Sequence, residues 1–341
     1  MRPFSYSRPA DLTQAVYLGA ATGQGTVDAP VQYLAGGTTL IDLMKLDVLR
    51  PTRLVDIGGL ATGLDVIEVQ PTGLRLGALA KMSTAADHPA LRLDYPVIAE
   101  SLSLAASAQL RNMATLGGNV LQKTRCPYYR DTTWAACNKR TPGSGCAAID
   151  GFNRNHAVLG VDHSCISQYP GDFAIALMAL DAQVSLRGPG GPRQIPFATL
   201  HRDPQGRPDI ETNLEPGEVI VGFEVPAASW YRRSVFVKVR DRASYEFAIA
   251  SAAVAVNLSG DTVREARIGL GGMAYRPWRA LAAEKFLVGK PLNELNALAA
   301  AEVALREAQP HGRNGYKPNL ARQTVVRALL QAKELRVAYV R

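Results

Sequence analysis

The sequence is poor in cysteine, histidine and aromatic residues for its length. Its 341 residues include four cysteines, five histidines and only 7% aromatic residues. So few cysteines in a chain of this size do not make a disulfide scaffold, and thiolate chemistry under reducing conditions is favoured instead. The histidines are scattered, so the sequence predicts neither a Ser-His-Asp site nor a site with paired carboxylates.

Long hydrophobic runs and a secretory signal are also absent. No stretch approaches the length of a membrane span, and the segment Met1-Arg2-Pro3-Phe4-Ser5-Tyr6 lacks the apolar core of a signal peptide. We therefore expect a globular protein that is not exported by a signal of its own. With 47% hydrophobic residues, a chain of this length should bury two or three cores.

The charge balance does not favour nucleic-acid binding. The formal net charge is +8, from 38 basic and 30 acidic residues, but the arginines are dispersed and no basic run alternates with aromatic residues. A modest positive excess is suited to anionic cofactors or acidic partner subunits, and it is equally typical of a solvated basic surface.

The hydrophobic pattern predicts an α+β protein with two domains. A short apolar strand, a glycine turn and a helix follow one another from Val31 to beyond Leu40, and a hairpin is expected over residues 64–79. The composition changes after Val225-Pro226, where an antiparallel meander precedes a group of helices. Trp278 is expected in the core, on the first of these helices.

Two glycine-rich loops have a composition suited to a phosphate-bearing cofactor. Paired glycines let the backbone approach a ligand closely, and successive N–H groups and hydroxyls can hold phosphate oxygens. Neither loop matches G-x-G-x-x-G or the P-loop, and a single Gly-Gly pair is more often a plain turn. The loops are Leu34-Ala35-Gly36-Gly37-Thr38-Thr39-Leu40-Ile41 and Thr115-Leu116-Gly117-Gly118-Asn119.

All four cysteines follow the second glycine loop within residues 123–167. They are Cys126, Cys137, Cys146 and Cys165, with ten, eight and eighteen residues between them. Soft thiolates gathered in one segment suggest a metal or iron–sulfur site, although the spacings fit neither a zinc ribbon nor a bacterial ferredoxin run. A zinc site that includes His156 or His163, and two disulfides, are the alternatives.

Taken together, these segments resemble a known flavoprotein family. The two loops, the segments at 171–182 and 238–247, Gly271-Gly272 and the later pattern over 279–290 resemble the FAD-binding medium subunit of the molybdenum hydroxylases. These include xanthine dehydrogenases, carbon monoxide dehydrogenases and aldehyde oxidoreductases. The resemblance implies a two-part FAD-binding domain of the vanillyl-alcohol-oxidase (PCMH) type over residues 1–224. It also implies a C-terminal α+β domain of the CO dehydrogenase flavoprotein type over 225–341.

The resemblance also implies roles for individual residues. Asp172 should accept a hydrogen bond from a flavin-side hydroxyl, although its position is also that of a helix N-cap. Lys238 should flank the isoalloxazine with Ile220, although alone it reads as a solvated strand lysine. Ala105 should lie beside the cofactor, but it is smaller than the residue often found there. The residues expected around the FAD diphosphate are Leu34, Ala35, Gly36, Gly37, Thr38, Thr39, Leu40, Ile41, Thr115, Leu116, Gly117, Gly118 and Asn119.

The cysteine segment resembles a subset of the family that carries a [4Fe–4S] insert. This subset includes periplasmic aldehyde oxidoreductases and benzoyl-CoA-type reductases, and the stretch from Cys126-Pro127-Tyr128-Tyr129-Arg130 to Gly143-Ser144-Gly145-Cys146 is most similar to the aldehyde oxidoreductase form. The resemblance implies that Cys126, Cys137, Cys146 and Cys165 ligate one [4Fe–4S] cluster in an insert at about 123–167.

The function implied is electron transfer within a heterotrimer. A large molybdopterin-binding subunit would oxidise an aldehyde, a small [2Fe–2S] subunit would relay the electrons, and the FAD of this chain would pass them to an external acceptor. The alternatives are a self-contained flavin oxidase or dehydrogenase, the flavin subunit of a benzoyl-CoA-type reductase, and a zinc-stabilised scaffold. The expected location is the periplasm, by co-export with a partner subunit, with the cytoplasm as the alternative.

Overall fold

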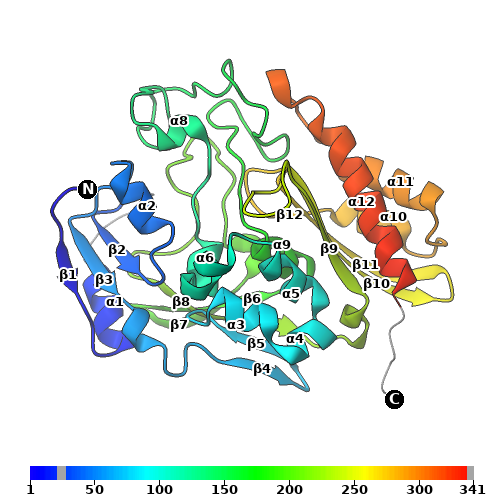
Figure 1. Ribbon diagram of the computed structural model, residues 1–341, viewed down its shortest axis with the longest axis horizontal. Helices are drawn as coiled ribbons and strands as arrows, with labels where there is room; N and C mark the ends of the chain where they lie inside the picture. The colour runs from blue at the N-terminus through cyan, green and yellow to red at the C-terminus, as the bar shows by residue number, and fades with distance from the viewer. Residues whose placement is uncertain (21–27, 336–341) are drawn as a thin grey trace.

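The computed structural model describes residues 1–20 and 28–335. Its N-terminal part holds a small parallel sheet in the order β1-β3-β2 (Figure 1). The strands are β1 (Ser5–Ser7), β2 (Val31–Leu34) and β3 (Arg53–Asp56), and the connecting helices are α1 (Leu12–Ala20) and α2 (Leu40–Lys45). Parallel strands need such crossover connections. The first glycine loop joins the end of β2 to the crossover helix α2.

The second sheet is antiparallel and has the order β4-β5-β8-β6-β7. Side chains of β6 alternate between half-buried and buried positions, so Val184 and Leu186 face the core. Helix α9 is buried on every side because all seven of its residues are apolar. The elements are β4 (Ile67–Gln70), β5 (Gly73–Gly77), β6 (Gln183–Gly188), β7 (Gly191–Pro196), β8 (Val219–Pro226), α3 (Met82–Asp87), α4 (Pro89–Asp94), α5 (Pro96–Ser103) and α9 (Phe173–Ala179).

The third sheet belongs to the C-terminal part and is covered on both faces. In β10, Ala253 and Ala255 pack into the core with α5 and α9, while Val254 and Val256 pack into a second core under the C-terminal helices. The sheet has the order β12-β11-β10-β9. The elements are β9 (Ser234–Val239), β10 (Ala250–Ser259), β11 (Thr262–Gly271), β12 (Trp278–Arg279), α10 (Leu281–Leu287), α11 (Glu294–Ala304) and α12 (Lys317–Glu334).

The remaining elements are short. Helices α6 (Ala108–Met113), α7 (Leu116–Val120) and α8 (Pro127–Arg130) flank or interrupt the cysteine segment. This segment forms the loops at the top of the view in Figure 1. The single-turn 3-10 helices are η1 (Gly58–Leu60), η2 (Phe197–Thr199), η3 (Ser229–Arg232) and η4 (Gly312–Asn314).

The predicted α+β organisation is confirmed, with two corrections. The alanine- and leucine-rich stretch 95–110, whose composition favours one continuous helix, forms the two helices α5 and α6, because Ala106 between them has a left-handed backbone with φ of 50°. Trp278 lies on β12 rather than on a helix, and it is half-buried. The boundary expected after residue 224 falls within β8. No helix in the described ranges combines the length and hydropathy needed to cross a bilayer.

Candidate cofactor site

The two glycine loops line one large cavity. The cavity contains about 1450 Å³ of empty space, part of which is open to solvent, and a third segment from Leu214 to Ile220 completes its wall. Ile220, predicted to flank the flavin, therefore lies with the loops. The lining residues contributed by the loops are Ala35, Gly36, Gly37, Thr38, Thr39, Leu40, Thr115, Gly117 and Gly118.

The first loop presents unused backbone donors. It leaves β2 after Leu34 and turns at Gly37, whose φ of 72° favours glycine. Within the described residues, no hydrogen bond uses the four successive N–H groups from Gly36 to Thr39. Four adjacent free donors on a loop without bulky side chains form a cradle that fits an anionic group such as a diphosphate.

The second loop uses its backbone donors internally. The N–H of Leu116 donates to the carbonyl of Ala80 (3.0 Å), and the N–H of Gly117 donates to that of Ala78 (2.8 Å). The Thr115 hydroxyl accepts from the N–H of Gly118 (3.3 Å) and caps α7. This loop therefore offers the cavity small side chains and close backbone approach rather than free N–H groups.

The loops also pack directly on each other. A methyl group built on Gly36 would lie 2.2 Å from the carbonyl oxygen of Met113, just before the second loop. A methyl group on Gly117 would lie 3.1 Å from Cβ of Ala78. Glycine is thus required at position 36 by a backbone contact, and it is favoured at position 117 by the close approach of Ala78.

Four of the predicted loop residues face away from the cavity. Leu34 and Ile41 pack with the small hydrophobic cluster around Leu43 and Leu54, and Leu116 is fully buried in the main core. The Asn119 amide nitrogen contacts the sulfur of Met82 at 3.3 Å, and its Oδ1 is buried without a hydrogen-bond partner.

Asp172 and Lys238 form a buried ion pair. Lys238 Nζ lies 2.6 Å from Asp172 Oδ2, and the two side chains are 1% and 4% exposed. Lys238 also donates to the carbonyl of Leu104 (3.0 Å), next to the buried Ala105. Asp172 makes no side-chain capping bond to α9, and Lys238 is not solvated. The structure brings Asp172, Lys238 and Ala105 together, but none of them lines the cavity of the glycine loops.

The four cysteines line a second, smaller cavity of about 290 Å³. All four are free thiols, so the disulfide alternative is wrong. A hydrogen bond from Cys146, opposed by burial and aided by the charge of Lys139, lowers the pKa of Cys165 to about 6. Burial raises the pKa of Cys126 to about 12. His156 Nε2 lies 3.2 Å from Cys126 Sγ.

The arrangement of these side chains does not form a site for a single metal ion. Within the described residues, no group of three or more cysteine, histidine, aspartate or glutamate side chains is placed to hold one. This disfavours the zinc alternative, and it lends no support to the predicted cluster beyond the shared cavity.

Several residues at the cavity were not predicted. Tyr33 lines it and donates from its hydroxyl to the carbonyl of Gly217 (2.9 Å). Glu218 lines it and pairs with Arg193. Lys123 also lines it and pairs with Glu211, 88 residues away. No local pattern marks these residues, because each depends on a partner far along the chain.

Two family models and a curated relative match nearly the whole chain. Residues 2–228 match the family described as the FAD-binding domain in molybdopterin dehydrogenase, and residues 235–332 match the CO dehydrogenase flavoprotein C-terminal domain. The chain is 43% identical to the aldehyde oxidoreductase FAD-binding subunit PaoB of Escherichia coli (strain K12), over 98% of this chain and 99% of that one.

A second curated relative is more distant. The chain is 27% identical to the carbon monoxide dehydrogenase medium chain of Hydrogenophaga pseudoflava, over 96% of each.

Solved structures share the fold along nearly the whole chain. A carbon monoxide dehydrogenase from Hydrogenophaga pseudoflava, which lacks the Mo-pyranopterin moiety of its cofactor, superposes with a TM-score of 0.75 at 27% identity, covering 97% of this chain and 98% of that one. A reconstituted CO dehydrogenase from Oligotropha carboxidovorans gives a TM-score of 0.75 at 26% identity, covering 98% and 99%. The predicted two-domain fold is confirmed, and the chain belongs to the FAD-binding medium-subunit family of the molybdenum hydroxylases, a family of oxidoreductases.

Proposed function

We propose that this chain is the FAD- and [4Fe–4S]-binding electron-transfer subunit of a molybdenum-dependent aldehyde oxidoreductase with three different subunits. The observation that carries the proposal is the 43% identity, along the whole chain, to a protein named as the FAD-binding subunit of an aldehyde oxidoreductase. The partners are a large molybdopterin-binding subunit and a small [2Fe–2S] subunit.

The residues of the large cavity support binding of a cofactor rather than chemistry on an aldehyde. The free N–H groups from Gly36 to Thr39 would hold the FAD diphosphate, and Ile220 would cover an apolar part of the cofactor. When bound, FAD supplies the capacity to accept and release electrons. Among the described lining residues the carboxylates are Glu215 and Glu218, and Glu218 is already paired with Arg193. No unpaired acid–base pair is found among these described residues, which supports oxidation of the aldehyde by a partner subunit.

Two features support a cluster at the cysteines. The four thiols are free, and they share one cavity. Thiolates that hold a cluster lie further apart than ligands of one ion, because each binds a different iron. A missing single-ion site is therefore compatible with a cluster.

The subunit assignment is tested by purifying the tagged chain with and without its partners. The complex should oxidise aldehydes and reduce an external acceptor, and it should lose acceptor reduction when FAD is removed. The chain alone should accept electrons from artificial donors and leave aldehydes unchanged. Aldehyde turnover by the chain alone would establish the self-contained flavin enzyme instead.

The cluster is tested by metal and sulfide analysis of the anaerobically purified chain. We expect about four iron and four acid-labile sulfide per chain, and their loss in Cys137→Ser. Because metal binding is coupled to folding, this variant should also unfold at lower denaturant. Stoichiometric zinc without labile sulfide would refute the cluster.

A further inference from the structure

The large cavity has one cationic side chain among its described lining residues. The charged side chains there are Lys123, Glu215 and Glu218. Glu218 is paired with Arg193 at 2.5 and 2.7 Å, so its charge is balanced outside the cavity. Lys123 follows the second glycine loop by four residues, and the predictions from sequence assigned it no role.

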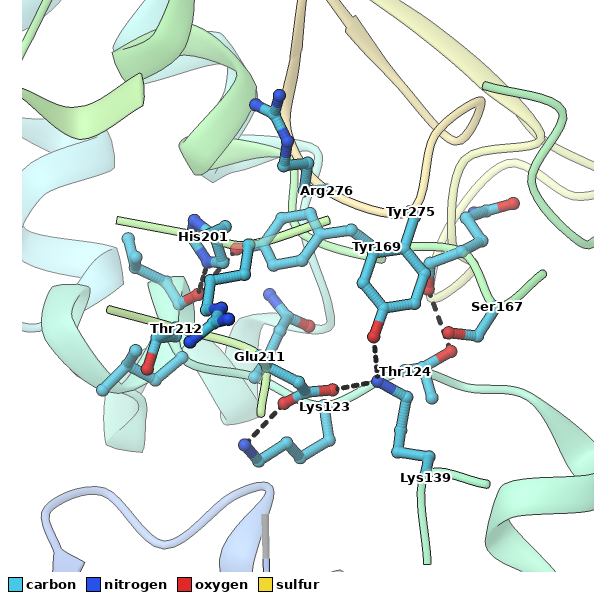
Figure 2. A pocket seen from close by; sticks show the side chains of 15 residues that line it. Lys123, Thr124, Lys139, Ser167, Tyr169, His201, Glu211, Thr212, Tyr275 and Arg276 are labelled. Carbon is cyan, nitrogen blue, oxygen red and sulfur yellow. Dashed lines mark hydrogen bonds and ion pairs between the residues drawn. The ribbon is translucent and has the colours of Figure 1, made fainter. Parts of the chain in front are cut away.

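Lys123 belongs to a partly buried network of three charges (Figure 2). Its Nζ lies 2.6 Å from Glu211 Oε2, and Lys139 Nζ lies 2.7 Å from Glu211 Oε1. Burial alone would raise the pKa of Glu211, but the charges of Lys123 and Lys139 outweigh it and lower that pKa to about 2. The carboxylate is therefore ionised, and the network carries a net charge of +1.

Lys139 shares Glu211 with Lys123 and has no donor left for a ligand. It is 2% exposed and also donates to the carbonyl of Pro208 (3.0 Å) and the hydroxyl of Tyr275 (2.8 Å), so its three N–H groups all have acceptors.

Lys123 has donors to spare. It is 20% exposed, and Glu211 is its one acceptor among the described residues. Two of its N–H groups are therefore available at the cavity, on a cluster of three side chains with a formal net charge of +1.

We propose that Lys123 is a further cofactor-binding residue that supplies a cationic contact to FAD, with Glu211 and Lys139 as positioning residues. The proposal rests on FAD occupying the cavity of the glycine loops. FAD offers a cation two anionic partners, the diphosphate and the flavin ring once reduced. Either anionic group would balance the net positive charge of the Lys123–Glu211–Lys139 network at the cavity.

The experiment uses the full-length chain freed of flavin and titrated with FAD. Lys123→Gln keeps a hydrogen-bonding group for Glu211 but removes the charge. We expect it to raise the Kd for FAD about tenfold to a hundredfold, the range for losing a hydrogen bond with a charged group. The salt dependence of binding should also weaken. Lys123→Arg should restore both, and Lys45→Gln, an exposed lysine outside the cavity, should change neither.

Two further measurements separate the two sources of negative charge. ADP carries the diphosphate without the flavin ring. If Lys123 contacts the diphosphate, Lys123→Gln should weaken competition by ADP as much as binding of FAD. If it contacts the ring, competition by ADP should be unchanged, and the reduction potential of the bound flavin should fall.

If Lys123→Gln binds FAD and ADP as tightly as the wild type does, and its flavin potential is unchanged, the proposal is overturned. Lys139 still balances Glu211 in Lys123→Gln, so this variant should fold, as urea unfolding will show. If it does not fold, salt-independent binding of FAD to the wild type overturns the proposal instead. A wild-type chain that binds no FAD would contradict the proposed function rather than the role of Lys123.

Discussion

The two glycine loops share a Gly-Gly core in sequence but present different chemical groups to the same cavity. The first loop leaves the N–H groups from Gly36 to Thr39 free, whereas the second donates its N–H groups to Ala78, Ala80 and the Thr115 hydroxyl. The first loop therefore offers backbone donors, and the second offers shape and side chains.

The difference follows from what lies beside each loop. The first emerges from the end of a parallel strand, where no acceptor among the described residues pairs with its N–H groups from Gly36 to Thr39. The second runs next to residues 78–82, whose carbonyl groups accept its N–H groups. Identical dipeptides thus reach different chemistry because their neighbours differ.

The two loops also differ in the charged residues that follow them. Lys123, just beyond the second loop, lines the cavity and is held by Glu211. The charged residues after the first loop, Asp42 and Lys45, do not line it.

The largest effect is expected from Glu211→Gln. It leaves Lys139 almost fully buried without its counter-charge, and breaking a buried pair in this way costs about 3–5 kcal/mol of unfolding free energy. Urea unfolding at pH 7 measures it. Glu215→Gln, an exposed change in the same segment, should stay within about 0.5 kcal/mol. Equal stability of the two variants would refute a structural role for the network.

The stability difference between wild type and Glu211→Gln should also depend on pH. The pKa of Glu211 is lowered from 4.5 to about 2 on folding, so the unfolded chain binds its proton first as the pH falls. The stability contributed by Glu211 is therefore complete above about pH 5 and is lost towards pH 2. The difference in unfolding free energy between wild type and Glu211→Gln should narrow over that range. A constant difference would contradict the assignment.

A smaller effect is expected where the loops touch. Gly36→Ala places a methyl group 2.2 Å from the Met113 carbonyl oxygen, which forces the backbones apart at a cost of about 1–3 kcal/mol. Binding of FAD should weaken as well, because the first loop shifts. Gly190→Ala is the control, since no atom lies within 4 Å of the added methyl group. Equal denaturation midpoints of Gly36→Ala and Gly190→Ala would show that the contact between Gly36 and Met113 is not tight.

The smallest effect compares the two threonines that precede the loop helices. Thr115 caps α7 through its hydroxyl, whereas Thr39 makes no side-chain capping bond to α2. In flavin-free protein, Thr115→Ala should lose about 1 kcal/mol, and Thr39→Ala should lose less than about 0.5 kcal/mol. Thermal unfolding of both variants measures the difference, and the reverse order would be inconsistent with the capping.

Local features of the sequence predicted much of the fold and part of the site. Apolar strand patterns and turn signals placed β2, the hairpin of β4 and β5, and the meander that contains β10, because these patterns depend on neighbouring residues. They failed at Ala106, where a left-handed residue ends the helix, and at Trp278, which pairs with Leu270 on β11. The ion pair between Lys238 and Asp172 spans 66 residues, so neither side chain shows in sequence which group it meets.

The sequence by itself determined that two glycine loops exist, that all the cysteines lie in one segment, and that two α+β parts follow one another. These properties depend on residue type and near neighbours, which the chain carries in any conformation. Only the tertiary structure decided which loop keeps its N–H groups free, which residues share the cavity, and that Lys123 lines it as part of an ion-pair network of formal net charge +1. Those outcomes depend on carbonyl groups and carboxylates brought together from distant segments, and a hydrogen bond or ion pair forms only between groups that the fold places in contact.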